Sequence, residues 1–225
     1  MSKKSSSKTN FLAQGTILVI ASFVAKAIGM IYRIPLTHIL GDDGNGYYST
    51  ANEIYTIILM ISSFSLPLAV SRLVAEREYA GEVKNSYKVL ICSLRFAAVT
   101  GGILSILTFL LGGVITKYVM GVELASYALR VLAPAIFLFA LTGVLRGFFQ
   151  GHGTMVPTAV SQIIEQIFVA TFALLMSHVF IQHFSATGDM DLVHRWGAAG
   201  ATMGTGAGVA SALIFMLIVY GVNRK

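Results

Sequence analysis

Apolar residues run along the chain in long stretches that are separated by short polar stretches. The six apolar stretches are Phe11–Tyr32, Ile54–Ser71, Val89–Ile115, Ala125–Leu145, Val156–Ile181 and Gly197–Val222. Parts of three of them, at 54–71, 96–116 and 196–223, contain no charged residue at all. A helix that crosses the hydrocarbon core of a bilayer needs ~20 apolar residues, whereas a soluble core requires no such windows. The pattern predicts an all-α, polytopic membrane protein with six transmembrane helices.

The segments between these stretches are short and are expected to be loops. They are a turn-rich loop at Gly41–Thr50, a charged loop at Arg72–Lys88, a turn at Lys117–Leu124, a polar turn at Arg146–Met155 and a longer polar stretch at Gln182–Trp196. Residues 1–10 are rich in Ser and Lys and are predicted to be disordered, which leaves residues 11–225 as one transmembrane lobe. The basic start and the first apolar stretch resemble a signal peptide, but five further stretches follow, so we expect an uncleaved first helix.

Basic residues concentrate in alternate connections. With the N-terminus in the cytoplasm, the inner segments hold Lys3, Lys4, Lys8, Arg72, Arg77, Lys84, Lys88, Arg146, Arg224 and Lys225. The outer segments hold only Lys117 and Arg195. This bias follows the positive-inside rule, and it predicts a multi-pass protein of the cytoplasmic membrane with both termini in the cytoplasm.

Composition excludes several other classes of protein. Charged residues make up 12% of the chain and apolar residues 56%, with a mean hydropathy of +0.76. The net charge of +6 does not indicate nucleic-acid binding, because the basic residues lie between the apolar stretches and orient them. The single cysteine, Cys92, excludes a disulfide framework, and the scattered histidines have no metal-ligand spacing. We therefore expect no metal and no cofactor.

Ionisable residues inside the predicted spans are the candidate substrate-binding residues. They are Lys26, Arg33, Glu53, Arg95, Arg130 and Glu165. Each costs ~2.5–3.5 kcal/mol at a helix centre on insertion scales, so such a residue tends to face a partner or a wet cavity. Four of the six are cationic, and a cavity with surplus cations attracts an anionic substrate, with arginine pairing phosphate through its planar fork.

Several of these residues also have a simpler interpretation. Arg33 and Arg130 lie within about two turns of a span end, where a long side chain reaches the interface at low cost, and Arg95 fits either role. Glu165 is either a site residue or the neutralising half of a buried pair. Lys26 and Arg33 are seven residues apart, which places them on one helix face and suits a two-phosphate group.

Glycines at four-residue spacing in the last span form a ridge of small residues. Gly200, Gly204 and Gly208 are followed by Ala212, a pattern that allows close approach of two helices and in a transporter gives a sliding surface. A nucleotide-binding loop is excluded, because the spacing of the glycines is wrong and no strand precedes them.

Several motifs resemble the bacterial oligosaccharide and lipid flippase family, in the branch of stage V sporulation protein B and the lipid II flippase. The motifs are KAIGMIYRIP at 26–35 with LG at 40–41, GxGYY at 44–48, LPxAxSR at 66–72, LRGFFQG at 145–151 and MxPTAxSQxxEQ at 155–166. They extend over nearly the whole chain, and the Arg-Gly-Phe-Phe-Gln-Gly segment with the Pro-Thr and Ser-Gln-x-x-Glu-Gln that follow is the most specific part.

The resemblance implies an exporter fold of two six-helix lobes around a cationic cavity, shared with multidrug (MATE-like) exporters. Alternating access would move a lipid-linked oligosaccharide or peptidoglycan precursor to the outer leaflet, without covalent chemistry and therefore not as an enzyme. The basic positions of the family's first helix fall on Lys26 and Arg33. We also expect structural or gating roles for Arg146 and Gln150, as for the glycines of the last span. The sequence departs from the family in stopping after one lobe, in lacking a basic residue at 54–70 and in carrying Ile167 to Val169 where an arginine is common. A truncated product and a self-assembling half-transporter both fit.

The expected partners are an anionic lipid-linked sugar, membrane lipids, and a second six-helix lobe or another copy of the chain. One alternative function is a drug or organic-cation exporter, which would favour carboxylates over the cations found here. A membrane transferase would need clustered acidic residues near one membrane face, and the close pairs, Asp42 with Asp43 and Asp189 with Asp191, lie in predicted outer loops. A non-transporting membrane assembly protein is the third alternative.

Overall fold

Helices form nearly the whole of residues 2–223, which the computed structural model describes, with side chains described from residue 14. They are α1 (Ser2–Ser62), α2 (Leu66–Tyr79), α3 (Val83–Tyr118), the short η1 (Glu123–Ala125), α4 (Ser126–Gly151), α5 (Val156–Ser185) and α6 (Met190–Asn223). The expected all-α polytopic class is confirmed. Residues 1–10, which were expected to be disordered, lie outside the part of the chain whose side chains the structure describes.

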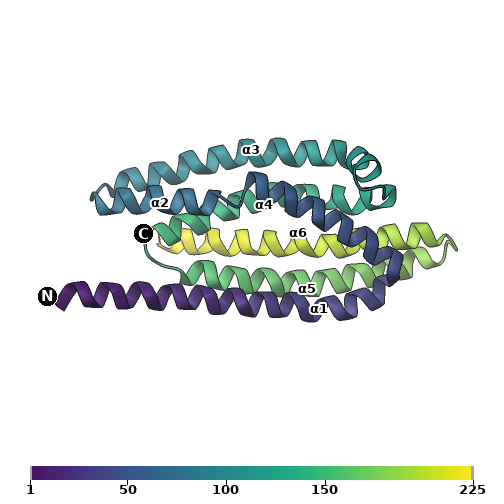
Figure 1. The fold of residues 1–225 in the computed structure, drawn as a ribbon, viewed down its shortest axis with the longest axis horizontal. Helices are drawn as coiled ribbons and strands as arrows, with labels where there is room; N and C mark the ends of the chain where they lie inside the picture. The colour runs from purple at the N-terminus through teal and green to yellow at the C-terminus, as the bar shows by residue number, and fades with distance from the viewer. Residues whose placement is uncertain (1, 224–225) are drawn as a thin grey trace.

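Among the residues that the structure describes, five segments are long and apolar enough to cross a membrane. The first of them, Gln14–Tyr79, is folded back on itself. The helix geometry breaks at Gly41, where φ is 68° and ψ is −178°. The hydroxyl groups of Tyr32 and Tyr48 lie 3.3 Å apart, although sixteen residues of straight helix would separate them by ~24 Å. The first and second predicted spans are therefore the two limbs of one bent segment, which runs on into α2 (Figure 1).

Gly41 makes this reversal possible in one residue. A positive φ with an extended ψ is open to glycine and strained for residues with a Cβ. Asp42 to Thr50 are helical, so the turn-rich loop expected at 41–50 is wrong except at its first residue.

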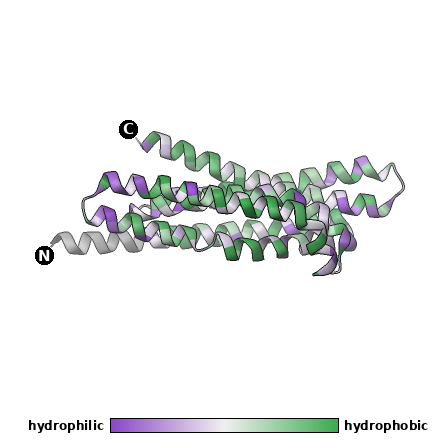
Figure 2. Cartoon of the chain, turned by 90° about the horizontal axis from the view of Figure 1, so that it is seen from above, coloured by the Kyte–Doolittle hydropathy of each residue, from purple (hydrophilic) through white to green (hydrophobic). Residues whose placement is uncertain are grey.

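Three other expected loops are shorter than the sequence pattern suggested. α2 continues to Tyr79 and α3 begins at Val83, α4 continues to Gly151, and only residues 186–189 separate α5 from α6. The reason is that helices do not end where the hydrocarbon ends. The 36 residues of α3 span ~54 Å against a core of ~30 Å, and the ends of such a helix carry charged side chains into water. Hydrophilic residues accordingly gather at both ends of the bundle in Figure 2.

α4 is the central helix of the bundle. Its apolar window is 61% buried inside the protein, whereas the windows of the other spans are 17–22% buried. One core cluster joins α4 to the second limb of α1 and to α6 around Leu132 and Ile136, and a second joins it to α2 and α3 around Val144 and Leu145. α5 packs between α6 and the first limb of α1. The remaining apolar faces point outward, as they do in a helix bundle that contacts lipid.

Candidate functional site

A cavity of about 760 Å³ opens between the first limb of α1 and helices α4 and α5, and we call it the central groove. Its charged lining consists of Lys26 and Arg33 from α1, Arg146 from α4 and Glu165 from α5. Gln162 and Gln166 of α5 add amide groups. The described lining of the groove therefore holds three cations and one carboxylate.

Lys26 and Arg33 are both exposed on the groove face of α1. Their spacing of seven residues is two turns of helix, or ~10 Å along the axis. Arg33 also lines a neighbouring cavity of about 540 Å³, together with Glu53 and Asn52 from the second limb of α1. The bend at Gly41 thus brings Glu53 next to Arg33, and Arg33 lies where the two cavities meet.

Arg146 and Glu165 form a nearly buried ion pair between α4 and α5. Nη2 of Arg146 lies 2.7 Å from Oε2 of Glu165, and the two side chains are 10% and 13% exposed. Nε of Arg146 donates a second hydrogen bond of 2.9 Å to Oγ of Ser161, which itself donates to the carbonyl of Thr158. Of the two interpretations of Glu165, the geometry favours the neutralising partner, and the cation that it neutralises is Arg146.

This position of Arg146 corrects the expectation of a polar turn at 146–155. α4 remains helical to Gly151, and Arg146 is buried in it rather than placed in a connecting loop. Gln150, one turn further on, donates from Nε2 to Oγ1 of Thr158 at 3.4 Å. The ends of α4 and α5 are therefore joined by side chains from the LRGFFQG and MxPTAxSQxxEQ motifs.

Polar contacts also hold α1 against α5. Oγ of Ser22 donates to Oε1 of Gln162 at 2.9 Å, and the backbone N–H of Met155 donates to Oε1 of Gln14 at the same distance. A Cβ at Gly29 would lie 3.4 Å from Oε1 of Gln166, so the glycine lets this amide approach the helix closely. Gln162 and Gln166 were not among the candidate residues, and the available signal for them was their place in the SQxxEQ motif.

The structure does not bring all the candidate residues together. Arg95 is exposed on α3 and lines neither the central groove nor the cavity beside it. Arg130 lines a different cavity, at the other end of α4 from Arg146. The candidates thus divide into a groove set (Lys26, Arg33, Glu165), a neighbour (Glu53) and two residues elsewhere.

The glycine ridge of α6 lies against α5. A Cβ at Gly200 would lie 2.7 Å from the carbonyl oxygen of Met176, and one at Gly204 would lie 2.5 Å from the backbone nitrogen of Ala173. At Gly208 the carbonyl oxygen of Glu165 would be 2.7 Å away. α6 therefore supports α5 directly behind the residue that pairs with Arg146.

Two further glycines, which the sequence analysis did not single out, pack α4 against α2. A Cβ at Gly147 would lie 2.5 Å from the carbonyl oxygen of Pro67, and one at Gly151 would lie 2.6 Å from Cβ of Val74. Their spacing of four residues in LRGFFQG was the available signal, because it is the same small-residue spacing as in α6. These contacts help to fix Arg146, which lies directly before Gly147.

The residues in the central groove suit the binding of an anion. Within the part of the chain with described side chains, no group of three or more His, Cys, Asp or Glu residues is placed to hold a metal ion. Arginine and lysine donors with adjacent amides bind phosphate oxygens well. The apolar groups along the groove, including Phe23, Met30 and Phe139, provide a surface for a lipid chain.

The comparisons with known proteins identify a family and several relatives. Residues 11–220 match the family model described as polysaccharide biosynthesis protein. Stage V sporulation protein B of Bacillus subtilis (strain 168) is 27% identical over 217 residues, which cover 96% of this chain and 40% of that protein. Lipid II flippase MurJ of the same organism is 27% identical over 223 residues, covering 95% and 40%.

A third relative has no assigned function. Uncharacterized membrane protein YabM of Bacillus subtilis (strain 168) is 31% identical over 210 residues, which cover 93% of this chain and 37% of that protein. The chain thus spans about two fifths of the length of the curated relatives it matches. No solved structure matches it.

Proposed function

The chain belongs to the polysaccharide biosynthesis protein family, and from that premise we propose that it forms one lobe of a flippase for a lipid-linked sugar. The observation that carries the proposal is that Lys26 and Arg33 line one groove, while the one carboxylate of its described lining is already paired with Arg146. Two positive charges are therefore left for an anionic substrate. The similarity to a protein named lipid II flippase supports the same class of substrate.

The headgroup of such a lipid is a diphosphate joined to a sugar. Lys26 and Arg33 would bind the phosphate oxygens, Arg33 through two parallel N–H donors, and the amides of Gln162 and Gln166 would bind sugar hydroxyls. The lipid chain would stay outside, along the apolar residues of α1 and in the bilayer. Because movement across the membrane breaks no covalent bond, the proposed activity is transport and not enzymatic conversion.

The groove would change its access from one side of the membrane to the other through motion against a second lobe. That lobe would come from another polypeptide segment or from another copy of the chain. With the termini in the cytoplasm, as the distribution of basic residues favours, the protein would lie in the cytoplasmic membrane and deliver its substrate to the outer leaflet. An exporter of organic cations fits less well, since Glu165 is neutralised by Arg146.

Binding to the purified chain tests the site directly. We expect the chain in detergent to bind an undecaprenyl diphosphate sugar more tightly than undecaprenol, since only the former carries phosphate. Lys26→Ala with Arg33→Ala should weaken binding by at least about tenfold, the loss of one or more charge-assisted hydrogen bonds. Arg95→Ala is the matched control, because it removes an exposed arginine outside the groove.

Transport itself needs a complete transporter. The same variants, in this lobe joined to a second lobe of the family, should fail to complement a flippase-deficient strain, whereas Arg33→Lys should retain part of the activity because it keeps the charge and loses the fork. Full complementation by the double variant would show that Lys26 and Arg33 are interfacial anchors, and the proposed headgroup site would have to be abandoned.

A further inference from the structure

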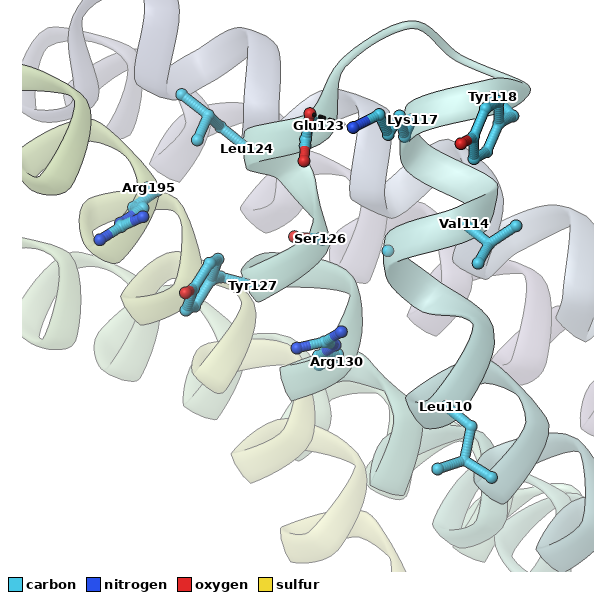
Figure 3. Close-up of a pocket in the computed structure, with 11 residues that line it drawn as sticks. Leu110, Val114, Lys117, Tyr118, Glu123, Leu124, Ser126, Tyr127, Arg130 and Arg195 are labelled. Atoms are coloured by element: carbon cyan, nitrogen blue, oxygen red, sulfur yellow. Dashed lines mark ion pairs between the residues drawn. The ribbon is translucent and has the colours of Figure 1, made fainter.

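A third cavity lies at the end of the bundle away from the chain termini, and we call it the distal cavity (Figure 3). It has a volume of about 480 Å³ and lies between the last turns of α3, the start of α4 and the first turns of α6. Lys117, Arg130 and Arg195 line it, with Glu123 as its carboxylate. It shares no lining residue with the central groove.

Only one of the three cations is neutralised by a described residue. Nζ of Lys117 lies 3.0 Å from Oε2 of Glu123, and both side chains are about half exposed. Within residues 14–223, neither Arg130 nor Arg195 forms an ion pair. The cavity therefore retains two guanidinium groups whose charge is not balanced.

Both guanidinium groups are held in place by their surroundings. Cζ of Arg195 lies 4.8 Å from the centre of the Tyr127 ring, over its face. Nε of Arg195 is buried and has no hydrogen-bond partner among the described residues. The side chain of Arg130 lies along Gly112 and Gly113 of α3. A Cβ at Gly112 would be 3.4 Å from Cγ of Arg130, and one at Gly113 would be 3.3 Å from Nη2 of Arg130.

The backbone adds a further preference for negative charge. Ser126 and Tyr127 are the first residues of α4, a helix of 26 residues, and both line the cavity. The amino end of a helix carries partial positive charge and favours anions. Two unbalanced arginines beside such an end form a site for a group with several acceptor oxygens, and phosphate fits that description.

The position of the cavity indicates where this phosphate comes from. Leu110 and Val114 form an apolar side of the cavity on α3, while Tyr118 and Lys117 lie at its rim, one turn further on. Apolar residues next to tyrosine and lysine at the end of a long span mark the boundary between hydrocarbon and headgroups. We propose that the distal cavity binds the phosphate group of an anionic phospholipid, whose acyl chains lie along α3.

Purified chain in detergent, analysed by native mass spectrometry, tests this proposal. With equal amounts of phosphatidylglycerol and phosphatidylcholine added, the chain should retain phosphatidylglycerol preferentially. Arg130→Gln with Arg195→Gln should lower that retention about tenfold or more, since charge-assisted hydrogen bonds to phosphate are lost. Arg130→Lys with Arg195→Lys should lower it less, and Arg95→Gln, an exposed residue of α3 outside the cavity, should leave it unchanged.

Two further measurements separate a lipid site from a general effect of the fold and from a site for a free anion. Gly113→Ala removes no charge but places a methyl group against Nη2 of Arg130, so it should weaken retention while thermal unfolding stays close to that of the wild type. Inorganic phosphate or glycerol 3-phosphate at millimolar concentration should not displace the lipid. Displacement by either would assign the site to a free anion, and equal retention by the wild type and the Gln double variant would overturn the proposal. Neither result bears on the central groove, whose test uses Lys26 and Arg33.

Discussion

Arg146 and Glu165 lie 2.7 Å apart between α4 and α5, and this contact decides the charge of the central groove. The pair cancels one cation against the one carboxylate of the described lining, so the remaining positive charge is that of Lys26 and Arg33. Both paired side chains are nearly buried, and Ser161 satisfies a further donor of the arginine. The pair therefore joins α4 to α5 through contacts within the chain itself.

Removing one partner of this pair should destabilise the lobe strongly. Glu165→Ala leaves a buried guanidinium without its carboxylate, which typically costs about 3–5 kcal/mol. Arg146→Met combined with Glu165→Met removes both charges and should recover most of the loss, because well-packed apolar pairs replace buried ion pairs with little penalty. Thermal unfolding of the purified chain in detergent measures this. A double variant that is no more stable than Glu165→Ala would show that the loss does not come from an unpaired buried guanidinium, and this explanation would fail.

The close packing of the α6 glycine ridge against α5 can be tested at Gly204, with Gly206 of the same helix as the control. Gly204→Ala places a methyl group 2.5 Å from the backbone of Ala173, so it should destabilise the α5–α6 contact by about 1–3 kcal/mol. Gly206→Ala meets nothing within 4 Å and should be neutral or stabilise by up to about 1 kcal/mol, as alanine does in a helix. Gly204→Ala should therefore lower the melting temperature whereas Gly206→Ala should not, and an equal decrease in both variants would contradict the packing argument.

Gly41 has a different requirement, which is conformational rather than steric. No atom lies within 4 Å of a Cβ built at this position, yet φ is +68°. Gly41→Ala should therefore cost about 1–3 kcal/mol through backbone strain alone, because this combination of φ and ψ is essentially restricted to glycine. Gly46→Ala, in the helical second limb with equal free space, is the control and should not destabilise. Unfolding in detergent distinguishes the two, and a tolerant Gly41 would show that the bend can form by other means.

The orientation in the membrane is testable with cysteine labelling. With the native Cys92 changed to Ser, Ala80→Cys places a thiol in the exposed α2–α3 turn, and Thr187→Cys places one in the α5–α6 turn. The distribution of basic residues predicts that an impermeant maleimide added to intact cells labels Thr187→Cys and not Ala80→Cys. Labelling of Ala80→Cys in intact cells would reverse the proposed orientation, and labelling of both would contradict the crossings themselves.

The class of fold was predictable from the sequence because the membrane imposes it. Charge-free windows of about twenty residues have few solutions other than a spanning helix, and this gave the all-α, polytopic architecture. The ends of the helices were not predictable in this way. Hydropathy locates the part of a helix that lies in the hydrocarbon core, not the ends of the helix. Arg146 and the residues after Gly41 are polar and were therefore assigned to loops, although they are helical.

The candidate site was predictable only in part, for a similar reason. The cost of a charge in a membrane drew attention to Lys26, Arg33 and Glu165, which do share a groove. The same cost gave no information on which helix faces meet, so Arg95 and Arg130 entered the same set although they lie elsewhere. An ion pair between two helices depends on the tertiary structure, so the sequence alone does not show that Arg146 of α4 is the partner of Glu165 of α5.

The bend at Gly41 also limits how the lobe can move. Helical hydrogen bonds hold the residues on both sides of it, so the angle between the two limbs of α1 depends chiefly on two torsions, φ and ψ of one glycine. Arg33 lies on the first limb and Glu53 on the second, and they line one cavity. A rotation about these two torsions would change the separation of the two charges directly, so the width of the neighbouring cavity is coupled to the backbone conformation of one residue.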